Sequence, residues 1–216
     1  MTGILFDLDG TLLDTLDDLM DGVNHALTQF GYPARSREEI RRFVGNGAAN
    51  LLQRSVPQGA EWEKPLEVFQ GFYREHCQIK TAPYPGIPEA LEILSKRYPV
   101  AIISNKPDKA TKKLCAQYFP GIYAQGETPG CPRKPAPDMV YAGMKQIGAD
   151  GCIYVGDSEV DVLTARNAGV PCLSVLWGFR DQEEIREAGG SRFCTDPKEL
   201  VSTLENMMKE MKINGK

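Results

Sequence analysis

Two aspartates separated by one residue, Asp7 and Asp9, end the first apolar stretch of the chain, which reads ILFDLDGT over residues 4–11. Side chains alternate along a β-strand, so Asp7 and Asp9 start out on the same side. Neighbouring carboxylates repel each other, and each is costly to remove from water without a partner. The pair therefore predicts a positive charge between the two carboxylates, or between them and a substrate.

Further polar groups follow the other apolar stretches. Short, continuously apolar runs, typical of buried parallel strands, lie at 100–104, 122–124, 152–156 and 172–175. In open parallel sheets, ligands bind beyond the carboxyl ends of the strands. The groups expected to meet the first pair there are Gly10, Thr11, Ser104, Asn105, Lys106, Lys134, Asp157, Ser158 and Asp161.

This set of groups favours a hard cation and a phosphate. The chain has only two histidines and no closely spaced cysteine pair, which argues against zinc, whereas carboxylates are ligands that Mg2+ prefers. Lysine and hydroxyl donors around such a cation describe a phosphate site. One carboxylate can attack phosphorus to form an aspartyl phosphate, and a second can carry protons for the leaving alcohol and for water. Gly10 would let the backbone turn sharply beside the phosphate.

Helical patterns alternate with these strands, which indicates an α/β fold with a parallel sheet. Apolar residues recur at helical spacing in 87–98, in 138–147 and after Pro197. The segment 15–83 contains no convincing strand and predicts helices at 16–30, after Ser36 and at 66–79. We therefore expect a core of residues 1–14 and 84–216, with a helical domain of residues 15–83 inserted after the first strand.

The composition is that of an ordinary globular protein and argues against several classes of partner. Hydrophobic residues make up 42% and charged residues 25%, and the net charge is -4, so neither nucleic acid nor an anionic membrane is an expected partner. No apolar run approaches the ~18 residues of a membrane span, and no signal peptide is recognisable. The six dispersed cysteines show no disulfide pattern. Together these features predict a cytoplasmic protein.

Four short motifs resemble, in order, those of haloacid dehalogenase (HAD) superfamily phosphatases: DLDGT at 7–11, ISN at 103–105, KPAPD at 134–138 and GDSEVD at 156–161. The resemblance extends over essentially the whole chain and is closest to the phosphoglycolate phosphatases, whose helical cap matches the insert. Within the insert, FVGNGAANL at 43–51 resembles their cap loop. The resemblance implies a Rossmann-like HAD core with an inserted helical-bundle cap, Mg2+ as cofactor and a small phosphorylated metabolite, 2-phosphoglycolate, as substrate.

The resemblance also implies roles for the charged residues of the motifs. Asp7 would be the nucleophile and a metal ligand. Asp9 would be the general acid and base, with its backbone carbonyl on the metal. Lys134 would neutralise the nucleophile and the phosphate together. Asp157 would bind Mg2+, with Asp161 supporting the metal site from behind.

Other implied roles concern the substrate and the movement of the cap. Asp14 and Thr15 stand where the chain leaves the core, so they are hinge candidates for a cap that would close and exclude water. Substrate or phosphate would be bound by Gly10, Thr11, Ser104, Asn105, Lys134 and, from the cap, Asn46.

Several functions stay open from the sequence. A sugar-phosphate mutase would share Asp9 and a helical cap, and a pyrophosphatase or nucleotidase is compatible with the same motifs. A dehalogenase fits poorly, because Asp9 and Asp157 are both present. A non-catalytic binding module would be expected to have lost a nucleophile or a metal ligand, and none is missing here. The chain is expected to be a monomer or a homodimer.

Overall fold

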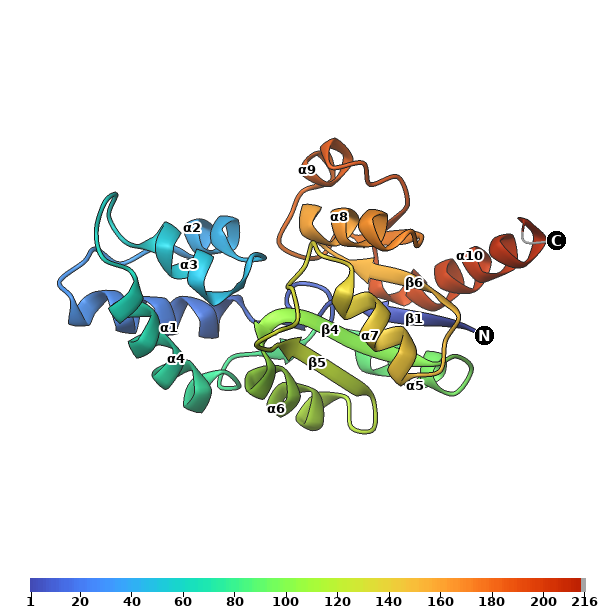
Figure 1. The fold of residues 1–216 in the computed structure, drawn as a ribbon, viewed down its shortest axis with the longest axis horizontal. Coiled ribbons are helices and arrows are strands. Elements are labelled where there is room, and N and C mark those ends of the chain that lie inside the picture. The colour runs from blue at the N-terminus through green and yellow to red at the C-terminus, as the bar shows by residue number, and fades with distance from the viewer. Residues whose placement is uncertain (215–216) are drawn as a thin grey trace.

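The computed structural model describes residues 1–214, and its centre is a sheet of six parallel strands in the order β5-β4-β1-β6-β7-β8 (Figure 1). This confirms the predicted α/β fold. Five strands overlap the predicted apolar runs, and the two-residue edge strand β8 is too short to leave a sequence signal. The strands are β1 (Thr2–Phe6), β4 (Val100–Pro107), β5 (Tyr123–Glu127), β6 (Gly151–Gly156), β7 (Cys172–Val175) and β8 (Phe193–Cys194).

Both faces of the sheet are buried under helices. Ile4 and Phe6 of β1 belong to one large apolar cluster, whereas Leu5 belongs to a second cluster on the opposite face. Burial on both sides explains why the strands are continuously apolar. No helix within residues 1–214 is long and apolar enough to cross a membrane. The covering helices are α5 (Ile87–Ser95), α6 (Asp108–Tyr118), α7 (Asp138–Gln146), α8 (Glu159–Ala168), α9 (Gln182–Glu187) and α10 (Leu200–Asn214), the last preceded by a short 3-10 turn, Pro197–Glu199.

Four more helices form a group to one side of the sheet (Figure 1). The chain enters and leaves this group through a two-stranded antiparallel ribbon, β2 (Leu13–Asp14) and β3 (Ala82–Pro83). Within the group, α1 packs against α2, α3 and α4. The division into two domains at residues 15 and 83 stays a prediction. The four helices are α1 (Leu16–Gln29), α2 (Arg37–Phe43), α3 (Gly47–Ser55) and α4 (Glu63–His76).

The helices differ from the expectation in several places: α5 ends at Ser95 and not at residue 98, and α9 was not predicted. The helix predicted at 66–79 begins at Glu63 and ends at His76. The segment 43–51 is a loop only around residues 44–46, because α3 begins at Gly47. The helix α6 was not predicted, since its exposed face is mostly polar and only four of its residues are buried. The capping box at Ser36 is present, with Glu39 as its partner.

Asp18 ties the helical insert to the segment that returns to the core. Its carboxylate is buried in α1 and accepts hydrogen bonds from the backbone N–H of Lys80 (3.0 Å) and of Thr81 (2.8 Å). Buried N–H groups need a partner. Asp18 therefore satisfies two backbone donors immediately before β3 and holds the two chain crossings together.

We expect Asp18→Ala to lower the free energy of unfolding by about 2–4 kcal/mol, because charge-assisted hydrogen bonds are lost and buried donors are left unpaired. Urea denaturation followed by circular dichroism measures this loss. The matched control is Asp21→Ala in the same helix. The Asp21 carboxylate forms an ion pair with Lys80 at the surface. Equal losses for the two variants would contradict the role given to Asp18.

Candidate active site

A cavity lies between the carboxyl edge of the sheet and the helical insert, with about 660 Å³ of free space including the part open to solvent. Its two walls differ in chemistry. The insert contributes mainly apolar side chains: Leu19, Val44, Ala48, Leu51, Phe69 and the ring of Tyr73. The sheet edge contributes most of the polar and charged groups, among them Asp7, Asp9, Ser104, Asn105, Lys106, Lys134, Asp157, Ser158 and Arg180.

Asp7, the residue after β1, forms a buried ion pair with Lys134 at 2.7 Å. The Lys134 ammonium also donates to Asp161 (2.8 Å) and to the hydroxyl of Tyr154 (2.9 Å), so its three N–H donors are all used. Burial acts to lower the pKa of Lys134, but the carboxylates of Asp161 and Asp7 outweigh burial and raise it. The ammonium therefore stays charged and fixed in place beside Asp7.

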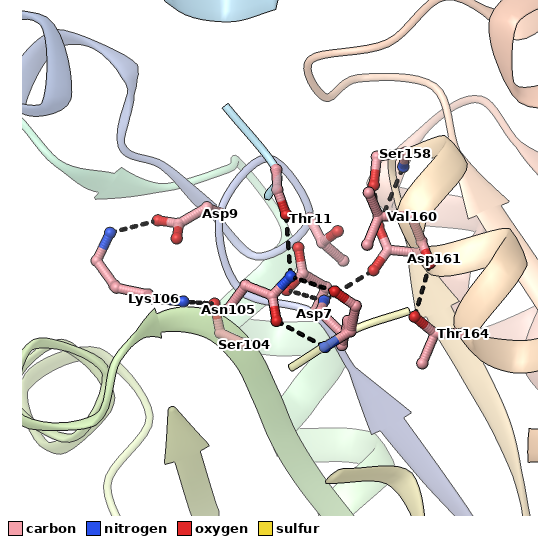
Figure 2. A network of polar contacts seen from close by, with 12 residues as sticks. Asp7, Asp9, Thr11, Ser104, Asn105, Lys106, Ser158, Val160, Asp161 and Thr164 are labelled. Atoms are coloured by element: carbon pink, nitrogen blue, oxygen red, sulfur yellow. Dashed lines mark hydrogen bonds and ion pairs between the residues drawn. The ribbon is translucent and has the colours of Figure 1, made fainter. Parts of the chain in front are cut away.

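Asp9 contacts a different lysine. The ammonium of Lys106, at the end of β4, donates to the Asp9 carboxylate at 2.8 Å (Figure 2) and lies 4.8 Å from the ring centroid of Tyr73. The strand ends at Phe6 and the chain turns at Gly10, whose φ is 86°, so the strand alternation does not continue to Asp9. The positive charge expected between the two carboxylates, or between them and a substrate, stays a prediction. Each carboxylate has its own lysine.

Asp157, the residue after β6, completes a buried acidic cluster with Asp7 and Asp161, in which one carboxylate oxygen of each lies within 4.8 Å of the others. Asp157 accepts hydrogen bonds from the hydroxyl of Thr11 (3.1 Å) and the backbone N–H of Phe179 (2.7 Å). Burial, and then the charge of Asp161, raise the pKa of Asp157 to about 7. Burial likewise raises the pKa of Asp7, although Lys134 opposes this.

The donor set of this cluster fits a divalent cation. Within residues 1–214, four aspartates line or support the cavity floor and face the ammonium groups of Lys106 and Lys134, while Arg180 is paired with Glu159, which leaves an excess of negative charge. Carboxylate oxygens suit a hard cation such as Mg2+. Asp161 is the least available, because its oxygens already accept five hydrogen bonds. Asp7 and Asp157 are therefore the better ligands, with Asp161 orienting its neighbours.

Two residues predicted to bind phosphate, Ser104 and Asn105, line the cavity from within β4, because this strand continues to Pro107 and does not end at residue 104. Ser104 is buried there, and its hydroxyl oxygen accepts from the backbone N–H of Lys106 (3.2 Å). The amide of Asn105 is occupied: it accepts from the N–H of Lys134 (2.8 Å) and donates to the carbonyls of Lys134 (2.9 Å) and Gly45 (3.1 Å). Asn105 thus fixes the lysine loop, and the phosphate contacts of both residues stay predictions.

Three other predicted substrate residues lie behind or beside the cavity. A Cβ on Gly10 would lie 2.3 Å from a carboxylate oxygen of Asp157, so only glycine lets the turn approach so closely. Thr11 donates to the same carboxylate. Asn46 does not line the cavity, whereas its neighbours Gly45 and Gly47 do. Gly10 and Thr11 therefore position Asp157, and a substrate contact of Asn46 stays a prediction.

The loop at residues 44–46 of the insert is held by side chains of the core. Arg180 donates to the carbonyls of Arg41 (2.8 Å) and Val44 (2.7 Å) at the C-terminal end of α2, and pairs with Glu159 (2.9 Å). Asn105 bonds the carbonyl of Gly45, as above, and Arg133 donates to that of Asn46 (3.3 Å). Core donors therefore reach three successive carbonyls of the insert, an arrangement that we call the carbonyl clasp.

No pattern in the sequence marks Arg180, Arg133 or Tyr73 as part of the site. Each contacts the opposite side of the cavity through a partner more than 30 residues away in the chain, and no local motif marks them. Lys106 belongs to the groups expected beyond the strand predicted at 100–104, but the sequence predicts no role for it, and the structure places it near the end of β4. Its position directly after Ser104 and Asn105 was the available signal.

Comparisons with known proteins agree with this geometry. The sequence profile of the family described as haloacid dehalogenase-like hydrolase matches residues 4–175. A phosphoglycolate phosphatase of Pseudomonas fluorescens is 34% identical over 214 residues, covering 92% of this chain and 78% of that protein. Another, of Aquifex aeolicus, is 32% identical over 219 residues, covering 97% and 100%.

Solved structures give the same result. The crystal structure of a candidate phosphoglycolate phosphatase from Lactobacillus delbrueckii subsp. bulgaricus has a TM-score of 0.88 and 34% identity, covering 94% of this chain and 98% of that one. A predicted phosphoglycolate phosphatase from Haemophilus somnus has a TM-score of 0.84 and 26% identity, covering 94% and 97%. The resemblance found in the four motifs is confirmed, and the chain belongs to the haloacid dehalogenase-like hydrolase family.

Proposed function

We propose that this protein is a divalent-metal-dependent phosphatase that hydrolyses 2-phosphoglycolate through an aspartyl phosphate formed on Asp7. The observation that carries the proposal is that Asp7 and Asp9 face one cavity but are held by different lysines. A two-step phosphoryl transfer needs such a division between a nucleophile and a proton carrier. The substrate is proposed from the names of the relatives.

In the first step, a carboxylate oxygen of Asp7 attacks phosphorus while the bond between phosphorus and the alcohol oxygen of the substrate breaks. Lys134 stays charged beside Asp7 and offsets charge on the phosphoryl oxygens. Asp9 donates a proton to the leaving alcohol oxygen. We assign Ser104, on the same cavity wall, to the transferring phosphoryl group.

In the second step, Asp9 takes a proton from water, and the water oxygen attacks the phosphorus bound to Asp7. The bond between phosphorus and the Asp7 oxygen breaks, which releases inorganic phosphate and restores the carboxylate. Asp9 has then given one proton and received one. The Lys106 contact holds Asp9 on the cavity wall throughout this exchange.

We further propose that the metal is Mg2+, held by the carboxylates of Asp7 and Asp157 and by the backbone carbonyl of Asp9. When bound, it would neutralise charge on the phosphoryl oxygens. Asp161 keeps the arrangement in place because it accepts from the backbone N–H of both Asp157 and Ser158. Gly10 and Thr11 brace Asp157 from the other side.

A mutase, a pyrophosphatase and a nucleotidase are less favoured alternatives, because the relatives over nearly the whole chain are named phosphatases. A binding module is also less favoured, since Asp7, Asp9, Lys134 and Asp157 line the cavity and Asp161 bonds Lys134 beside it. The partner is proposed to be a small phosphorylated metabolite. A cytoplasmic location and a monomeric or homodimeric state stay predictions; the six cysteines are all free, in keeping with a reducing compartment.

The test of the function is phosphate release from 2-phosphoglycolate, sugar phosphates, nucleotides and pyrophosphate, with and without Mg2+. We expect a Mg2+-dependent preference for 2-phosphoglycolate, and at least a ~1000-fold loss of turnover in Asp7→Asn, which keeps the shape but removes the nucleophile. The matched control is Asp150→Asn, at an exposed carboxylate far from the cavity. Turnover by Asp7→Asn at the wild-type rate would exclude the aspartyl phosphate.

Metal binding should depend on pH through Asp157. Its pKa of about 7 in the folded protein exceeds the usual 3.8, so the folded state binds more protons than the unfolded chain between these values. The metal-free protein should therefore lose stability as pH rises through this window. Mg2+ requires the ionised carboxylate, so the stabilisation that it gives should grow from about pH 5.5 to about pH 8.

Melting temperatures with EDTA and with Mg2+ at the two pH values measure this effect. In Asp157→Asn the stabilisation by Mg2+ should be small at both. A Mg2+ stabilisation in the wild type that does not change with pH would contradict the assignment of Asp157 as a ligand.

The carbonyl clasp should keep the insert closed over the cavity. Arg180→Met retains an apolar stem but removes the donors to α2, so we expect kcat/KM to fall about 10- to 100-fold. Amide hydrogen exchange at residues 41–46 should also accelerate. The control is Arg42→Met, because Arg42 has a 73% exposed side chain and forms a surface pair with Glu38. Unchanged exchange in Arg180→Met would contradict the clasp.

A further inference from the structure

Beside Asp9, the cavity holds hydrogen-bond donors that no group of the described chain uses. The Lys106 ammonium carries three N–H donors, and within residues 1–214 it has one hydrogen-bond partner, the carboxylate of Asp9. The hydroxyl of Tyr73 is buried and has no partner in the same residues. Lys106 is 5% and Tyr73 is 3% exposed. Buried donors are normally paired, so these two side chains point to a ligand.

These donors lie on the leaving-group side of the site. Figure 2 shows Asp9 and Lys106 to one side of Asp7 and Asp161 to the other. In the proposed mechanism Asp9 protonates the leaving alcohol, while Lys134 and the acidic cluster serve the phosphoryl group. A ligand group between Lys106 and Tyr73 therefore belongs to the leaving alcohol.

The other cations that line the cavity, Lys134 and Arg180, use all or nearly all of their donors on groups of residues 1–214. Lys134 uses its three N–H groups on Asp7, Asp161 and Tyr154. Arg180 is held by Glu159 and by carbonyls at the end of α2. Within the part of the chain that the structure describes, Lys106 is the cation at the cavity whose donors are mostly unused.

The surrounding wall selects a small leaving group. Leu19, Leu51 and Phe69 offer no polar partner, so the hydroxyl groups of a sugar or a nucleoside would be buried there without hydrogen bonds. A short alcohol that carries one compact anion suits the wall. Its anion would meet the ammonium of Lys106 and the hydroxyl of Tyr73.

We propose that Lys106 and Tyr73 form a carboxylate subsite that recognises the leaving group of the substrate. Both donate to one carboxylate, and Lys106 at the same time holds Asp9 near the ester oxygen. The inference rests on the proposed function and deepens it. Lys106 of the core and Tyr73 of the insert would together produce a preference for phosphomonoesters whose ester carbon bears a carboxylate.

The first test is binding of two stable phosphonates by isothermal titration calorimetry in the presence of Mg2+. They are 3-phosphonopropionate, an isostere of 2-phosphoglycolate, and propylphosphonate, in which a methyl group replaces the carboxylate. The wild type should bind the carboxylate-bearing ligand more tightly. Tyr73→Phe and Lys106→Met should each reduce this preference at least about tenfold, because a hydrogen bond to a charged group is lost.

Matched controls separate the subsite from general effects of these substitutions. Tyr32→Phe removes a hydroxyl from the insert whose contact is with an exposed carbonyl, and Lys109→Met removes an exposed lysine near β4. Neither should change the ratio of the two dissociation constants. Retained binding of propylphosphonate by Tyr73→Phe shows that this variant is folded. An unchanged ratio in Tyr73→Phe and Lys106→Met would overturn the subsite.

Turnover distinguishes failure of the subsite from failure of the proposed function. The comparison is kcat/KM for 2-phosphoglycolate and for ethyl phosphate, which lacks the carboxylate. If the wild type prefers 2-phosphoglycolate and both variants keep that preference, the function stands and the subsite is wrong. If the wild type hydrolyses neither ester but the variants lose the binding preference, the subsite stands and the proposed function is wrong.

Discussion

The ammonium of Lys134, placed between Asp7 and Asp161, is the contact on which the rest of the site depends. It joins the end of β1, the loop before α7 and the first turn of α8, which are far apart in the chain. Removing one partner of a buried pair leaves an uncompensated charge at a cost of about 3–5 kcal/mol. The backbone at Lys134 is also held in place, because the amide of Asn105 bonds both its N–H and its carbonyl.

That same amide connects the charged floor to the insert, because Asn105 also donates to the carbonyl of Gly45. The donors of the carbonyl clasp bond backbone carbonyls of the insert, so the clasp does not depend on the side chains of residues 44–46. The core and the insert thus contribute different kinds of side chain to the cavity. The core fixes the carboxylates of Asp7 and Asp9, while the insert supplies an apolar wall and the hydroxyl of Tyr73. Closing such a wall excludes water and strengthens every charge interaction inside.

Most of the fold was accessible from the sequence because buried parallel strands leave a local signal, as at 152–156, and so do helix caps such as Ser36. The positions of Asp7, Lys134, Asp157 and Asp161 relative to these strands likewise predict that they meet at one edge of the sheet. The divergence of Asp9 from Asp7 was not accessible, because it depends on where β1 ends and on a lysine almost a hundred residues away. The clasp was hidden for the same reason: an arginine that bonds distant carbonyls leaves no pattern in its own neighbourhood.

The choice between hydrolysis and a mutase reaction shows what the cavity adds to the motifs. In the proposed mechanism the motifs arrange phosphoryl transfer to Asp7. A mutase reaction would use the same motifs, so they say little about the group that leaves. A mutase must hold a sugar while its phosphoryl group is moved, which requires polar partners for several hydroxyl groups. The insert wall offers Leu19, Leu51 and Phe69 instead. This apolar wall gives a sugar no hydrogen-bond partners that would hold it as the phosphoryl acceptor in the second step. The cavity therefore favours water as the acceptor, which is hydrolysis.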